Sequence, residues 1–170
     1  FVLGAFLAIL WSFQRIFIET SSGRQRFNVL GALNAVTLEM ITVINQTYIN
    51  SWSVVELMRK VRLAHPVGRV VLILDNAGYQ ACYLVRSAAN MQGIELLFLP
   101  TYSPNLNLIE RVWKFVRKKC LNCVYYKNFD LFTGAILGCI SKFGTSYKEE
   151  LSSLLVWNFQ TFPTRGEVAA

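Results

Sequence analysis

The sequence predicts a mixed α/β fold in which early strands give way to alternating helices and strands. Three observations lead to this prediction. Short apolar runs separated by polar turns fill residues 11–49, which is typical of an antiparallel meander. Residues 70–74 then read Val-Val-Leu-Ile-Leu, the continuous apolar run of a central strand buried on both faces of a sheet. Segments whose apolar residues recur at helical spacing lie on both sides of this run.

The expected elements follow in chain order from the turn and cap residues between apolar segments. Strands are expected at 11–18, 27–33, 40–44, 70–74 and 95–99, and helices from Ser51 or Ser53 to Leu63 and at 79–91, 107–119 and 129–143. Phe1 to Trp11 reads as buried sheet, because about eleven apolar residues cannot cross a bilayer. This order fits a ribonuclease-H-like mixed sheet with helices on both faces over residues 1–147, followed by a carboxyl-terminal tail at 148–170.

Length and charge restrict the class of protein. The chain has 170 residues, enough for one domain with a sizeable core, and 54% of them are hydrophobic, which excludes a disordered chain. Seventeen Lys and Arg residues against ten acids give a net charge of +7. This balance favours a polyanionic partner, although soluble proteins without a nucleic-acid role also show it.

The cysteines and the single histidine give little support to a zinc site or a covalent nucleophile. Cys120 and Cys123 form one Cys-x-x-Cys pair without a second pair at zinc spacing. Cys82 and Cys139 are expected to lie in the core, in a reducing cytosolic setting rather than in disulfides. His65 lies in a connector, which disfavours a Ser-His or Cys-His system.

Two isolated acids, Asp75 and Glu110, stand where a metal-dependent nuclease needs carboxylates. Asp75 directly follows the apolar run, so it lies at the carboxyl end of a strand, where open α/β sheets place their ligands. Asn107 and Glu110 resemble a capping box at the start of a helix, and Lys114 and Arg117 fall within roughly 60° of Glu110 on that helix. Structural roles remain open for both acids, because Asp often caps a turn and Glu110 can pair with Lys114.

The surrounding residues resemble a known family. Leu-Ile-Leu-Asp-Asn-Ala-Gly at 72–78, Leu-Pro-Thr-Tyr-Ser-Pro at 99–104 and Leu-Asn-Leu-Ile-Glu-Arg-Val-Trp at 106–113 are similar to the second and third acidic blocks of DDE transposases of the mariner superfamily, in their bacterial insertion-sequence branch. Residues 76–109, thirty-four in all, separate the two acids, as the resemblance implies. The first catalytic Asp of the family would then lie just upstream of Phe1, in an amino-terminally truncated chain.

The resemblance implies a transposase that cuts and joins DNA strands with two Mg²⁺ or Mn²⁺ ions. Asp75 and Glu110 would be the catalytic acids and metal ligands. The expected DNA-binding residues are Arg24, Arg26, Lys114, Arg117 and Lys118, with Asn76 and Asn107 as supporting residues. The implied partners are transposon-end DNA, target DNA and, in the intact protein, a second copy of the chain, and the implied location is the bacterial cytoplasm at the nucleoid, without membrane attachment.

Two alternatives remain. One is a folded but inactive DNA-binding or dimerising transposase remnant that lacks the first acid. The other is a structure-selective nuclease of the same fold, which the connector at 99–107 disfavours. Glu19 and Glu39 are the acids of the early strands that could replace the missing ligand, and both are expected to face water.

Overall fold

The computed structural model describes residues 1, 3, 13–15, 25–100 and 106–155. Within these residues the elements are β1 (Asn28–Leu33), β2 (Met40–Asn45), α1 (Ser51–Ala64), β3 (Val70–Leu74), α2 (Tyr83–Met91), β4 (Ile94–Phe98), α3 (Leu108–Val116), the π-helical turn η2 (Arg117–Leu121), α4 (Phe129–Ile140) and α5 (Lys148–Leu154). The predicted mixed α/β class is confirmed. None of the described helices is long and apolar enough to span a membrane.

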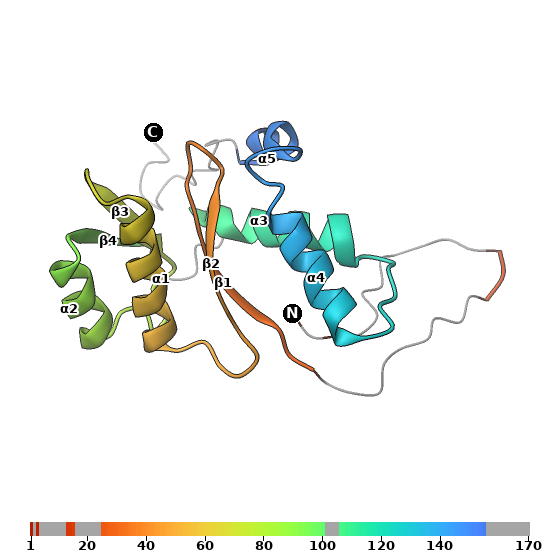
Figure 1. The fold of residues 1–170 in the computed structure, drawn as a ribbon, viewed down its shortest axis with the longest axis horizontal. Coiled ribbons are helices and arrows are strands. Elements are labelled where there is room, and N and C mark those ends of the chain that lie inside the picture. The colour runs from red at the N-terminus through yellow and green to blue at the C-terminus, as the bar shows by residue number, and fades with distance from the viewer. Residues whose placement is uncertain (2, 4–12, 16–24, 101–105, 156–170) are drawn as a thin grey trace, which may run out of the picture.

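The β1–β2 hairpin lies between two groups of elements (Figure 1): β3 and β4 with α1 and α2 on one side, and α3 and α4 on the other. Its strands are antiparallel, and Asn28 pairs with Asn45 and Leu33 with Met40. The predicted turn at Asn34 is confirmed, because the Asn34 side chain accepts hydrogen bonds from the backbone N–H groups of the next turn residues. Both strands therefore form where the apolar runs predict them.

β3 and β4 form a second, parallel pair, joined by α2 as the crossover helix. Val70 pairs with Ile94 and Leu74 with Phe98. Among the described residues the two pairs are separate two-stranded sheets, so the single extended sheet that the element order predicts is not seen there. Residues 11, 12 and 16–18 of the predicted strand at 11–18 lie outside the described residues, and the described residues 13–15 form no strand. Most of Phe1 to Trp11 also lies outside the described residues.

The prediction that β3 is buried on both faces is wrong for the described structure. Its Val70 and Leu72 pack against a buried cluster that α1 and α2 contribute. The alternate residues Val71 and Ile73 remain 45% and 47% exposed and line pockets between β3 and β1. One face of β3 is thus covered by helices, and the other borders a groove toward the hairpin.

A second and larger core joins α3, η2, α4 and α5. Its largest fully buried side chains come from these elements and the segment after α4: Val112, Val116, Leu121, Phe132, Ile136, Phe143 and Leu151. Residues 148–154, the first part of the tail predicted at 148–170, form α5, whose Leu151 is fully buried. The Lys119 Nζ also lies 2.6 Å from the Glu150 Oε2 on α5. The domain boundary at residue 147 stays a prediction, although α5 packs on the same core.

Side-chain contacts fix the start of helix α1. Its N-cap is Asn50 rather than the predicted Ser51 or Ser53. The Asn50 side chain accepts a hydrogen bond from the Ser53 N–H, and the Ser53 hydroxyl accepts one from the Asn50 N–H, which forms a capping box.

Helix α2 begins four residues later than the predicted start at residue 79. The N–H groups of Gln80 and Ala81 both bond to the Ala77 carbonyl, which forms a separate turn, and Cys82 then has an extended backbone. The turn chemistry at 76–78 thus continues further than the apolar spacing indicates.

Helix α3 ends at Val116, three residues before the predicted end, and continues as a wider π turn. The Asn122 N–H bonds to the Arg117 carbonyl across this turn. The inserted residue turns Leu121 into the core, where it is fully buried. Helical periodicity at 3.6 residues per turn does not predict this change of face.

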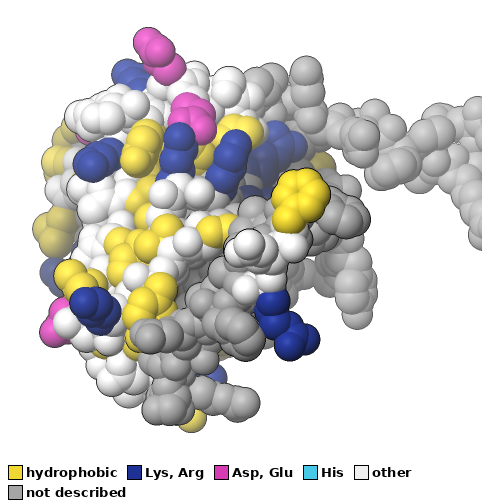
Figure 2. All heavy atoms as spheres, turned by 90° about the vertical axis from the view of Figure 1, so that its right-hand side faces the viewer, with side chains coloured by type: hydrophobic (Ala, Val, Ile, Leu, Met, Phe, Trp, Pro, Cys, Tyr) yellow, Lys and Arg dark blue, Asp and Glu magenta, His cyan; other side chains and the backbone are white. Residues whose placement is uncertain are grey.

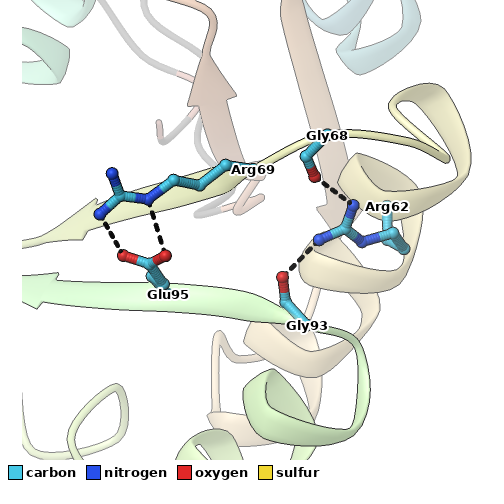
Figure 3. Close-up of polar contacts among 5 residues, drawn as sticks. All are labelled: Arg62, Gly68, Arg69, Gly93 and Glu95. Carbon is cyan, nitrogen blue, oxygen red and sulfur yellow. Dashed lines mark hydrogen bonds and ion pairs between the residues drawn. The ribbon is translucent and has the colours of Figure 1, made fainter.

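One guanidinium connects three backbone segments beside the parallel strands. Arg62 Nε donates to the Gln92 carbonyl at 2.8 Å, and Nη2 donates to the Gly93 carbonyl. Its Nη1 donates to the carbonyls of His65 and Gly68 at 3.1 and 3.2 Å. Figure 3 shows Arg62 on α1 reaching toward both glycine carbonyls. This contact fixes the end of α1, the start of β3 and the turn before β4.

Candidate active site

Asp75 lies where β3 ends, and its carboxylate is exposed. The Ala77 N–H donates to Asp75 Oδ1 at 3.3 Å, so one oxygen caps the turn as the structural alternative expects. Asn76 adopts a left-handed backbone with φ of 66°, a conformation that Asn tolerates better than most residues. The second carboxylate oxygen, Oδ2, has no hydrogen-bond partner among the described residues and is free to accept a ligand.

Glu110 lies in the first turn of α3 and is exposed. Asn107 caps the helix, because its side chain accepts from the Ile109 N–H at 3.2 Å. The predicted capping box is not formed among the described residues. The Asn107 oxygen accepts from the N–H of Ile109 instead of that of Glu110, and the Glu110 side chain does not bond back to the Asn107 N–H. Glu110 also forms no ion pair with Lys114 in the described structure. The Glu110 carboxylate therefore takes part in neither a capping box nor an ion pair among the described residues.

Both acids line one pocket of about 510 Å³. Asp75 enters it from the end of β3 and Glu110 from the start of α3, while β1 and β3 supply apolar walls. Trp113 also lines it, and its ring meets the Phe1 ring edge to face with centroids 5.8 Å apart. Strand end and helix start thus converge on one cavity, as the sequence predicts. The roles of the two residues as catalytic metal ligands stay a prediction.

Two further polar residues of the pocket were not identified from the sequence, Tyr79 and Gln80. Burial raises the pKa of the Tyr79 phenol, a hydrogen bond from Gln80 opposes that change, and the Asp75 carboxylate adds to the increase. Tyr79 therefore remains protonated near Asp75 at neutral pH. The sequence signal for both residues was their place four and five positions after the strand-end acid, at the end of the turn that follows it.

The predicted basic residues that the structure describes lie around the end of α3 and just before β1. Lys114, Arg117 and Lys118 are exposed around the end of α3 and the π turn. Figure 2 shows Lys and Arg side chains in a row across the side of the molecule that faces right in Figure 1. Arg26 lies just before β1, with its guanidinium 5.7 Å from the centre of the Tyr48 ring. Burial lowers the pKa of the Phe1 amino group, and the charges of Arg117 and Arg26 lower it further, so both arginines lie near Phe1. Arg24 lies outside the described residues.

The remaining titratable groups do not form a metal cluster. Among the described residues no group of three His, Cys, Asp or Glu side chains is placed to hold an ion. All four cysteines are free, and Cys139 is buried, as predicted, whereas Cys82 is only partly so. Glu39 is exposed, as predicted, and Glu19 lies outside the described residues.

The fold thus places a strand-end acid and a helix-start acid in one pocket, at the kind of position where open α/β sheets usually bind ligands. The chain belongs to the DDE superfamily endonucleases, because the model of that family matches residues 14–133. This match includes both acids and most of the described elements.

The chain is also similar to one curated protein in sequence and to solved structures in fold. The uncharacterized protein y4pE/y4sA of Sinorhizobium fredii is 42% identical over 60 residues, which are 35% of this chain and 42% of that protein. The Mos1 transposase paired-end complex with the left transposon end has a similar fold, with a TM-score of 0.60 at 12% identity over 93% of this chain and 54% of that one. The Mos1 strand transfer complex gives a TM-score of 0.59 at 14% identity, over 91% of this chain and 50% of that one. The chain thus spans about half the length of these proteins.

Proposed function

We propose that this chain is the catalytic domain of a transposase that cuts and joins DNA strands with divalent cations. The observation that carries the proposal is the pocket in which Asp75 and Glu110 both present carboxylate oxygens that no described residue neutralises. Membership of the DDE endonuclease family supports it. So do structural neighbours that were solved as transposase complexes, one of them with Mn.

The donor set of the pocket suits a hard divalent cation such as Mg²⁺ or Mn²⁺. Such ions bind through one or two carboxylates and keep several water molecules, so a full protein cage is not required. Asp75 and Glu110 would hold the ions, which when bound activate the attacking hydroxyl and neutralise the leaving oxygen of a phosphodiester. Asn107 would keep α3, and with it Glu110, in place through its cap, and Asn76 fixes the turn after Asp75.

We further propose that the two described sheets are halves of one ribonuclease-H-like sheet, with helices on both faces. Each pair has an open edge, and both edges border a groove, because β1 and β3 together line two pockets of about 720 and 510 Å³ that share Ala32, Leu33, Val71 and Leu72. Residues from the end of β1 and from the start of β3 line the same pocket, so the end of one strand lies opposite the start of the other. The two strands therefore run in opposite directions. One strand between them can be antiparallel to β1 and parallel to β3.

Contacts at Phe1 support a place for the first acid in this groove. Phe1 and Phe27 exchange both backbone hydrogen bonds, and the Leu3 N–H donates to the Gln25 carbonyl. In this antiparallel register Phe1 lies opposite Phe27, so residues that precede Phe1 in a longer chain would lie opposite β1. An Asp located a few residues before Phe1 would then face β1 within the pocket that contains Asp75. Such an Asp would supply the third carboxylate that the described residues lack.

The proposed partners are transposon-end and target DNA, with a second copy of the chain in the intact complex, in the bacterial cytoplasm at the nucleoid. Exposed Arg26, Lys114, Arg117 and Lys118 would bind the phosphate backbone rather than base edges, and Arg24 would extend the Arg26 region. Lys119 is less suited, because it already pairs with Glu150.

The test is nicking of supercoiled plasmid with Mg²⁺ or Mn²⁺ by this chain and by a chain extended upstream through the expected Asp. We expect cleavage only by the extended chain, since positioning errors of about 1 Å can cost about a hundredfold in rate. Asp75→Ala and Glu110→Ala should each abolish it. The matched control is Asp130→Ala, which removes an exposed acid from the first turn of α4 instead of α3.

Two results would contradict the proposal. Cleavage by the extended chain that survives either Asp75→Ala or Glu110→Ala would remove these residues from the reaction. Metal-dependent cleavage by the 170-residue chain alone would show that the third ligand lies within it. An extended chain that binds DNA without cutting would favour the inactive, DNA-binding alternative.

A further inference from the structure

Gln80 is a buried polar side chain in the wall of the pocket, and half of its amide lacks a partner. It is 6% exposed and lines the same pocket as Asp75 and Glu110. Its backbone N–H is fixed by the Ala77 carbonyl at 2.8 Å. Its Nε2 donates to the Tyr79 hydroxyl at 3.4 Å, while Oε1 has no hydrogen-bond donor among the described residues. The wall of the pocket therefore includes a residue whose buried side-chain oxygen has no donor among the described residues.

An acceptor in this state indicates a missing donor. Leaving a buried polar group unpaired costs about 1–3 kcal/mol, and buried side-chain oxygens in folded proteins usually have a protein or water partner. A buried water needs two to four polar partners. Asp75 and Tyr79 line the same pocket and can supply the others. A water molecule is thus the smallest donor that satisfies Gln80.

We propose that Gln80 is a positioning residue of the cation site, whose Oε1 accepts a hydrogen bond from a water molecule in the shell of a divalent cation at Asp75. This inference rests on the proposed function. Hard divalent cations retain water when they bind to one or two carboxylates, and outer partners of this kind orient the inner ligands. Gln80 suits the role because its oxygen is neutral, held by the turn and free of competing donors in the described structure.

The experiment measures Mn²⁺ affinity of the full-length protein by electron paramagnetic resonance, which needs no DNA and no cleavage. Gln80→Met keeps the side-chain size and removes the acceptor, and we expect about tenfold weaker Mn²⁺ binding. Gln80→Glu keeps an acceptor oxygen and should bind Mn²⁺ at least as well as the unchanged protein. The matched control is Gln92→Met, because Gln92 Oε1 is likewise buried and unpartnered but lies at the end of α2, away from the pocket.

The outcomes separate this inference from the proposed function. If Gln80→Met and Gln92→Met bind Mn²⁺ equally well, Gln80 does not position the cation shell. If Asp75→Asn binds Mn²⁺ as the unchanged protein does, or if the unchanged protein does not bind Mn²⁺, the cation site itself is refuted and Gln80 with it. Gln80→Met removes the unpartnered Oε1 and one long hydrogen bond to the Tyr79 hydroxyl, so little change in stability is expected, and thermal unfolding of Gln80→Met serves as the folding control.

Discussion

Replacement of Arg62 by Ala should destabilise the fold more than any other change to an arginine beside the parallel strands. Its guanidinium donates to four backbone carbonyls, those of Gln92, Gly93, His65 and Gly68. At about 1 kcal/mol net for each bond the contacts stabilise by about 4 kcal/mol. Release of the side chain returns about 2 kcal/mol of rotamer entropy. The expected loss in the free energy of unfolding is therefore about 2 kcal/mol.

The matched control is Arg69→Ala on the same pair of strands. Arg69 Nε and Nη2 lie 2.7 and 2.8 Å from the two carboxylate oxygens of Glu95, as Figure 3 shows, and both side chains are largely exposed. Exposed ion pairs contribute little, because water screens the charges and two long side chains are held in one geometry. We expect a much smaller change from Arg69→Ala, and a partial loss from Arg62→Lys, which keeps the charge but not the planar set of donors.

The assay is urea unfolding followed by tryptophan fluorescence and by circular dichroism. A loss of about 2 kcal/mol corresponds to a drop of about 4–8 °C in Tm for a chain of this size. Amide exchange at Gly68 and Gly93 should also increase in Arg62→Ala, because the segments that carry these carbonyls are released. Equal stability of Arg62→Ala and Arg69→Ala would refute the reasoning.

Three other predictions concern the second core, the thiols and the basic surface. Leu151→Ala should lower the free energy of unfolding by about 2–5 kcal/mol, because Leu151 is fully buried, whereas Leu154→Ala should lower it far less, because Leu154 is 44% exposed. Equal effects of the two changes in urea unfolding would contradict the packing of α5 on the core. Iodoacetamide should modify exposed Cys123 before buried Cys139, as mass spectrometry of the native protein can show, and the reverse order would contradict the packing of α4. DNA binding should be weak, largely independent of sequence and strongly dependent on salt, and Lys114→Ala should reduce the salt slope by about 1; an unchanged slope would remove Lys114 from the contact.

Much of the architecture follows from local signals in the sequence. The strands β1, β3 and β4 lie within a residue or so of the apolar runs that predict them, because β-branched runs bounded by turn residues have few other stable conformations. Asn107 caps α3 at the predicted position for a similar local reason. The shared pocket of Asp75 and Glu110 was predictable as well, since it depends only on which ends of the elements meet.

The features that the sequence did not predict depend on tertiary packing. The π turn after α3 is needed to bring Leu121 into the core, and helical spacing alone continues the α-helix instead. Helix α5 has seven residues and one fully buried side chain, too little for a periodic pattern. Gln80 reads as a turn residue in the sequence, and only the folded turn on Ala77 shows that its amide is buried.

The two acids can form the proposed cation site without a large cost in the stability of the fold. Asp75 and Glu110 are exposed, so neither carboxylate has lost its hydration in the cation-free state. Their backbones are nevertheless fixed, Asp75 by the β3–β4 ladder and the following turn, and Glu110 by the Asn107 cap. A cation bound at the proposed site would neutralise both carboxylates. Because such a ligand binds only the folded state, a Mn²⁺ concentration 100 times the Kd should raise the free energy of unfolding by about 2.7 kcal/mol, and this increase should be lost together with the Asp75 carboxylate.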